Sequence, residues 1–240
     1  MEKKKVWIFG DSYASPSWIT NVPHIWPLRL EKKYDVKNFA KGGTGIEWSI
    51  NTFFSEIKHY QTHNLDLSNI TVIFYVSEYL GRPNFHFIKN CHDQSNLKFI
   101  ANKRLINLGA LSPSTEDLKK TYDEYLNFIK DYFLYIYKHD ESNPLFFSQI
   151  LLLKHVSGLF NKLLCVPVFS DIDAFNEFYG RIENTDKFMI SKGNVMVNTN
   201  SLPDAPNHLS EINHDIVYNM TVDWIENNAV FDTRKLIKVS

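Results

Sequence analysis

A chain of 240 residues with 44% hydrophobic and 22% charged side chains fits one globular domain with a sizeable core, spanning residues 1–240. Its formal net charge of -1 gives no electrostatic reason to expect nucleic acid or an anionic membrane as a partner. Only two cysteines occur, so neither a disulfide framework nor a cysteine-based metal site is expected, and Cys165 is interpreted as a buried apolar residue.

Hydropathy gives no sign of a membrane segment. No apolar stretch approaches the roughly 20 residues that a membrane-spanning helix needs. The apolar run near the first residue is too short for a signal peptide. We therefore expect a protein located in a cytoplasm, or packaged in a particle assembled there.

The first part of the chain predicts three strands and a helix. An apolar run at 6–9 that ends at a glycine is typical of a buried strand. Apolar residues from Trp26 onward, followed by charged residues at 31–33, indicate a first helix. Two further apolar runs predict strands at 36–40 and 70–76.

A long excursion separates the third strand from the fourth. Residues 83–112 are polar and irregular and are interpreted as an insertion, and a helix is expected from about residue 114. A second helix at 145–162 then leads into a strand at 163–169. A last helix follows Ser210, which we expect to be its N-cap. Strands alternating with helices predict an α/β fold with a parallel sheet covered on both faces.

The predicted sheet selects the loops in which a site is expected. In an open parallel sheet, ligands bind beyond the carboxyl ends of the strands. This rule selects the loops at 10–15, 41–45, 77–82 and 170–173, and the segment at 204–210 has to join them from far along the chain.

Ser12 is the candidate nucleophile, in a Gly10-Asp11-Ser12 triplet directly after the first strand. A strand-to-helix turn exposes the hydroxyl and brings backbone N–H groups near it. The same triplet is also typical of a plain turn, since all three residues favour turns. Asp11 is interpreted as a turn-stabilising residue that hydrogen-bonds the local backbone.

His208, just before the last helix, is the candidate base. A serine hydroxyl is a poor nucleophile until a nearby base takes its proton. A histidine in such a loop can also be an ordinary surface residue, and the chain has nine histidines.

The motifs form an ordered set along the chain: Gly10-Asp11-Ser12, Asn38, Gly42-Gly43, Asp204 and His208. This set resembles the SGNH/GDSL family of serine hydrolases, and the resemblance runs from Val6 to about Trp224. It implies a flavodoxin-like three-layer α/β/α sandwich with a central parallel sheet and a Ser-His-Asp triad. It implies no metal and no organic cofactor.

The resemblance also implies the role of each site residue. Ser12 attacks the substrate, His208 is the base, and Asp204 orients the imidazole. Backbone N–H groups of Ser12 and Gly43 form the oxyanion hole. An alternative alignment puts Gly42 in the place of Gly43.

The triad carboxylate departs from the family pattern. The family's aspartate usually stands three residues before the histidine, where this chain has Ala205, and Asp204 stands four before. Asp171 and Asp173, after the fourth strand, are alternative carboxylates.

The third oxyanion donor departs as well. The family takes an asparagine side chain from the loop after the third strand, and this chain has none at that place. Ser77, Arg82 or the more distant Asn84 are the substitutes that the sequence offers. Arg82 has a second interpretation, as the ion-pair partner of Glu78.

These observations lead to a serine esterase or deacylase that hydrolyses an ester, including an O-acetyl group on a carbohydrate, through an acyl-enzyme. The expected partner is a small-molecule or carbohydrate ester, and the oligomeric state is left open. One alternative is an O-acyltransferase. Another is a binding or structural module of the same fold that has lost catalysis, including a phage- or virion-associated one.

Overall fold

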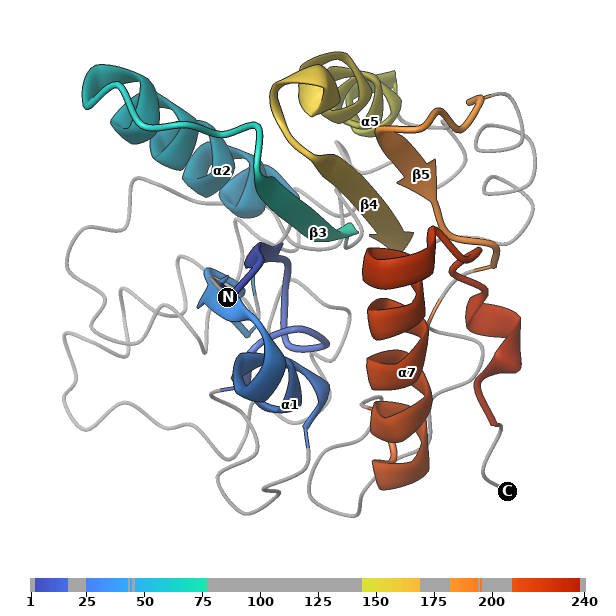
Figure 1. Cartoon of the computed structure of the whole chain (residues 1–240). Helices are drawn as coiled ribbons and strands as arrows, with labels where there is room; N and C mark the ends of the chain where they lie inside the picture. Colours follow the sequence, from blue (N-terminus) through green and yellow to red (C-terminus); the bar gives the residue numbers. More distant parts are fainter. Residues whose placement is uncertain are drawn as a thin grey trace, which may run out of the picture.

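The computed structural model describes residues 3–16, 25–42, 44, 46–76, 144–168, 182–193, 195 and 209–237. Its centre is a five-stranded sheet in which every pair of neighbouring strands is parallel (Figure 1). The strand order across the sheet is β2-β1-β3-β4-β5. The strands are β1 (Lys5–Phe9), β2 (Asp35–Asn38), β3 (Ile70–Val76), β4 (Lys162–Pro167) and β5 (Phe188–Ile190).

The central strands are apolar on both faces because both faces are covered. Every residue of β3 and β4 is buried, as are the last four residues of β1. Continuous apolar runs of this kind are typical of strands inside a parallel sheet. The edge strand β2 instead alternates exposed and half-buried residues, in keeping with its polar sequence.

Helices cover the two faces of the sheet in pairs. The helices α2 (Ile46–Thr62) and α5 (Pro144–Val156) pack on one face, in a cluster that includes Phe53 and Leu153. The helices α1 (Trp26–Lys33) and α7 (Glu211–Asn227) pack on the other (Figure 1). Two short 3-10 helices, Ser157–Leu159 and Thr233–Lys235, complete the described elements.

The two helices on the α1 side are joined at their starts. Ser210 caps α7 by accepting a hydrogen bond from the backbone N–H of Asn213 at 3.3 Å. The residue at the N-cap position of α1 makes no side-chain cap, and the backbone N–H of Trp26 instead donates to Nδ1 of His214 at 3.4 Å. A side chain of α7 therefore serves as a cap for α1.

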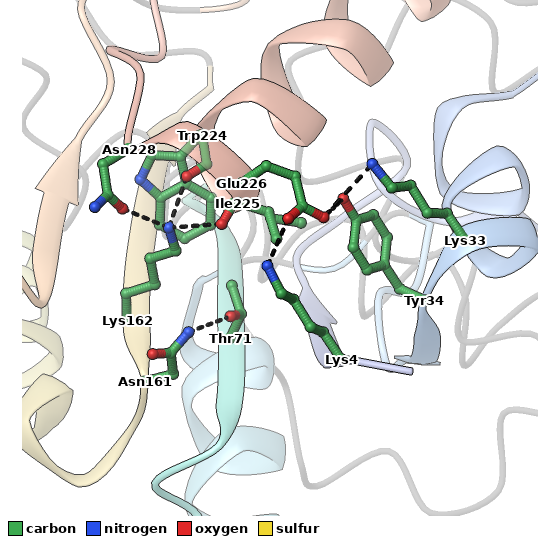
Figure 2. A network of polar contacts seen from close by, with 10 residues as sticks. All are labelled: Lys4, Lys33, Tyr34, Thr71, Asn161, Lys162, Trp224, Ile225, Glu226 and Asn228. Carbon is green, nitrogen blue, oxygen red and sulfur yellow. Dashed lines mark hydrogen bonds and ion pairs between the residues drawn. The ribbon is translucent and has the colours of Figure 1, made fainter. Parts of the chain in front are cut away.

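The carboxyl end of α7 is closed by a buried lysine at the start of β4 (Figure 2). Lys162 Nζ donates to the carbonyls of Trp224 at 2.7 Å and Ile225 at 3.0 Å, and to Oδ1 of Asn228 at 2.6 Å. These carbonyls belong to the last turn of the helix, where intrahelical donors run out, and the Trp224 carbonyl also accepts from the backbone N–H of Asn228 at 3.2 Å. A positive charge there also complements the helix dipole.

A second cluster of polar side chains, around Glu226, lies beside the Lys162 cluster at the same end of α7 (Figure 2). Glu226 accepts hydrogen bonds from Lys4 Nζ at 2.5 Å and from the Tyr34 hydroxyl at 2.8 Å. These two bonds, of which the one from Lys4 has the larger effect, lower the pKa of Glu226 to about 2. The last turn of α7 is thus bonded to the residue before β1, to the residue after α1 and to the first residue of β4.

The parallel α/β architecture is confirmed, and so are several elements. The strand at 70–76, the first helix and the Ser210 cap match the prediction, and the strand expected at 6–9 begins one residue earlier. Cys165 is buried in β4, where burial raises the pKa of its thiol.

Other boundaries were predicted wrongly. The helix expected over 145–162 ends at Val156, because a 3-10 turn follows and Lys162 already belongs to β4. The fourth strand accordingly starts at Lys162 and ends at Pro167. The second strand ends at Asn38 rather than at residue 40. Both α2 and β5 are elements that the sequence reasoning did not predict.

Two predictions fall in parts of the chain that lie outside the described residues. They are the insertion at 83–112 and the helix expected from about residue 114.

Candidate functional site

Ser12 lies immediately beyond the carboxyl end of β1, half-buried, in a turn built by its neighbour Asp11. The Asp11 carbonyl accepts from the backbone N–H groups of Ala14 at 3.1 Å and Ser15 at 2.9 Å. Asp11 Oδ1 accepts from the backbone N–H of Tyr13 at 3.0 Å. The prediction that Asp11 stabilises the turn is therefore confirmed, and its carboxylate is buried while the Ser12 side chain is partly accessible.

The turn begins at a glycine that the packing requires. Gly10 has φ +144°, a conformation that L side chains rarely adopt. A Cβ at this position would lie 2.6 Å from Cβ of Tyr75 on the neighbouring strand β3. Gly10 therefore lets the Ser12 turn come against β3 at close range.

The loop after β2 is tied to the Ser12 turn through Asn38. Asn38 Nδ2 donates to the carbonyl of Ala14 at 2.8 Å, and its Oδ1 accepts from the backbone N–H of Ala40 at 2.9 Å. The backbone N–H of Lys41 donates to the carbonyl of Gly10 at 3.0 Å. The Thr44 hydroxyl also donates to the Gly10 carbonyl, at 3.4 Å, so side-chain and backbone bonds together join the two loops that are expected to share the site.

Two buried aromatic side chains, Trp26 and Tyr75, lie next to the Ser12 turn. The indole N–H of Trp26 donates to the carbonyl of Tyr13 at 2.9 Å, and its ring stacks on Tyr75 with centroids 5.3 Å apart. Tyr75 is fully buried, and no described residue hydrogen-bonds its hydroxyl. Burial, with a smaller contribution from the Asp11 charge, raises the pKa of Tyr75, so this phenol stays neutral. From the sequence, neither ring was assigned to the site.

The position of Ser12 in the sheet is that of a topological switch point. Strand β1 lies between β2 and β3, and α1 and α2 lie on opposite faces of the sheet. In sheets of this kind a crevice opens at the carboxyl ends of the two strands where the chain reverses direction across the sheet, and ligands bind there. Ser12 follows directly from one of those strands.

The described residues resume at Leu209, directly after the expected base His208. Leu209 is buried in the same hydrophobic cluster as Tyr13 and Ala14, which follow Ser12 in the turn. Leu209, the residue after His208 in the sequence, is therefore on the face of the sheet that also holds Tyr13 and Ala14.

The remaining site predictions lie outside the described residues. They are Gly43, Ser77, Arg82, Asp204 and His208, together with the alternatives Asn84, Asp171 and Asp173. Gly42, the alternative to Gly43, is described and buried.

No group of three or more metal-binding side chains occurs among the residues that the structure describes. None of the helices in those residues is both long and apolar enough to cross a membrane.

Comparison with models of known protein families and with curated proteins gives no significant match to this chain.

Proposed function

We propose that the chain is a serine esterase or deacylase of the SGNH/GDSL type, with Ser12 as its nucleophile. The observation that carries the proposal is the placement of Ser12 at the switch point of the sheet, in a turn fastened to the loop after β2. The strand order 2-1-3-4-5 is that of flavodoxin-like sheets, as the resemblance expects.

The mechanism follows from the roles that the resemblance assigns. Ser12 attacks the ester carbonyl while His208 takes the hydroxyl proton, and Asp204 orients the imidazole. His208 then returns the proton to the leaving alcohol, and water resolves the acyl-enzyme. Backbone N–H groups of Ser12 and Gly43 hold the oxyanion, with Ser77 or Arg82 as a third donor.

The features seen around Ser12 suit this chemistry. An oxyanion hole works because its donors are fixed before the reaction begins. The bonds from Asn38 and Lys41 hold the two loops that carry the proposed donors at a fixed separation. The proposed substrate is an ester, first of all an O-acetylated carbohydrate, and acyl transfer to a sugar hydroxyl would differ only in the group that resolves the acyl-enzyme.

A fluorophosphonate probe and p-nitrophenyl acetate test the proposal directly. We expect wild-type protein to be labelled and to release acetate, and Ser12→Ala and His208→Ala to lose labelling and more than about 10⁴-fold in rate. Ser55→Ala, on the exposed surface of α2, is the matched control and should behave as wild type.

One outcome would favour the second candidate, a binding module of the same fold without catalysis. Ala205 at the family's aspartate position and the absent third-loop asparagine both favour that module. A folded wild-type protein inert to both reagents would refute the esterase proposal. Release of p-nitrophenol that requires an added sugar acceptor, with the acetyl group recovered on the sugar and not as free acetate, would identify an acyltransferase instead.

A further inference from the structure

Two exposed histidines lie one helical turn apart at the end of α2. His59 belongs to the last turn of the helix, and the backbone N–H of His63 continues the helical pattern by donating to the carbonyl of His59 at 3.2 Å. Side chains four residues apart on a helix face the same side. The two imidazole rings are 4.4 Å apart between centroids and tilted by 44°.

The tautomer of His63 is set by the helix. Nδ1 of His63 lies 2.8 Å from the carbonyl oxygen of His59. A carbonyl only accepts, so Nδ1 carries the proton, and the lone pair of the neutral ring is on Nε2. Histidines that bind metals commonly donate their other ring N–H to a backbone carbonyl in this way, which fixes the ring and raises its basicity.

The ring separation matches a chelate. With metal–nitrogen bonds of about 2.0–2.1 Å, two imidazoles bound in adjacent positions of one ion place their centroids about 4.5 Å apart. The observed separation of 4.4 Å agrees with this value within about 0.1 Å.

The backbone that carries the pair is held by the core. On the opposite side of the same helix, Phe53, Ile57 and Tyr60 are buried against the sheet. Binding then fixes only two exposed side chains, so the entropy cost of chelation is small.

We propose that His59 and His63 form a two-histidine chelate for a late first-row divalent cation, with Cu²⁺ and Ni²⁺ bound more tightly than Mn²⁺ or Mg²⁺. Imidazole suits these ions, and affinity rises along the series toward copper. Because no third protein ligand joins the pair among the described residues, solvent or an external ligand fills the remaining coordination positions.

This chelate is separate from the candidate catalytic centre. The end of α2 leads into the start of β3, which pairs with the start of β1, whereas Ser12 follows the carboxyl end of β1, at the opposite end of these parallel strands. Metal binding here and ester hydrolysis at Ser12 can therefore succeed or fail independently.

Calorimetric titration of the untagged full chain with NiCl₂ and with MgCl₂ at pH 7.5 tests the proposal. We expect one Ni²⁺ per chain and no heat with Mg²⁺. His59→Asn and His63→Asn should each weaken Ni²⁺ binding at least about tenfold, because the second ligand no longer binds within the same molecule. His155→Asn, which removes an exposed histidine of α5, is the matched control and should leave the affinity unchanged.

A rescue variant separates chelation from a general loss of surface histidine. In the His63→Asn background, Ser55→His restores a pair four residues apart with His59 on an exposed part of the same helix. The affinity for Ni²⁺ should then recover. Equal affinities of wild type, His59→Asn and His63→Asn, or no Ni²⁺ binding at millimolar concentration, would overturn the proposal.

Discussion

Replacing Lys162 by methionine removes the charge that closes α7 and keeps most of the apolar stem of the side chain. The variant leaves the carbonyls of Trp224 and Ile225 and the Asn228 amide oxygen without their ammonium donor. The carbonyl of Trp224 keeps a bond from the backbone N–H of Asn228 at 3.2 Å, and the exposed Asn228 side chain can turn to water. The main loss is therefore at Ile225.

The expected destabilisation by Lys162→Met follows from these lost contacts. One buried acceptor without a donor costs about 1–3 kcal/mol, and the loss of a cation at a helix carboxyl end costs about 0.3–1 kcal/mol. Against these stands the desolvation of the ammonium, which lowers the pKa of Lys162 and which the variant relieves. We expect a net destabilisation of about 2 kcal/mol, or a fall of about 4–8 °C in Tm.

Urea unfolding followed by circular dichroism and tryptophan fluorescence measures this effect. Trp224 is a suitable reporter, since the Lys162 ammonium lies 4.9 Å from its ring centroid. Lys58→Met, at an exposed lysine of α2, is the control and should change the stability by less than about 0.5 kcal/mol. An unchanged or increased stability of Lys162→Met would refute the capping argument, because it would mean that desolvation outweighs the three bonds.

Two further stability predictions follow. Glu226 has its pKa lowered from 4.5 to about 2 by its bonds from Lys4 and Tyr34, so its contribution is present above pH 4.5 and is lost as the pH falls toward 2. For this partly exposed group we expect about 1 kcal/mol, measured as a difference in stability between wild type and Glu226→Gln that is full at pH 7 and shrinks progressively between pH 4.5 and pH 2. An equal difference at pH 7 and pH 2 would contradict the assignment. Gly10→Ala should lower the free energy of unfolding in urea by about 1–3 kcal/mol or more. Gly158→Ala is the control and should be close to neutral, because a Cβ at that position meets nothing within 4 Å. Similar effects of the two changes would show that the turn is not packed as described.

The sequence predicted best those elements whose pattern depends on burial alone. The apolar run at 70–76 marks β3 because a strand covered on both faces has no polar face. The helix α2 escaped prediction although Ile46, Ile50, Phe53, Ile57 and Tyr60 repeat at helical spacing and are all buried. That signal was present in the sequence. By contrast β5 has three residues, too few for any periodicity.

At the candidate site, the sequence identified residue types but not the contacts between them. The turn chemistry of Asp11 is local and was predicted from three adjacent residues. The requirement for glycine at position 10 depends on Tyr75, which reaches it only through the register of β1 on β3. The role of Asn38 depends likewise on two loops meeting in space. Neither contact has a signature in the order of the residues.

The pairing of α1 with α7 has a consequence for how the molecule is made. Trp26 bonds to a residue 188 positions away, and Lys4 to one 222 positions away. Loop closure over such separations is slow, and it cannot begin on the ribosome before the distant partner emerges. The apolar cluster that contains Val6, Ile8 and Ile73 is therefore incomplete until the residues of α7 join it. A nascent chain is most prone to aggregate during that interval. A chaperone that shields this apolar surface on the ribosome would therefore raise the yield of folded protein more than a chaperone that acts after the chain is released.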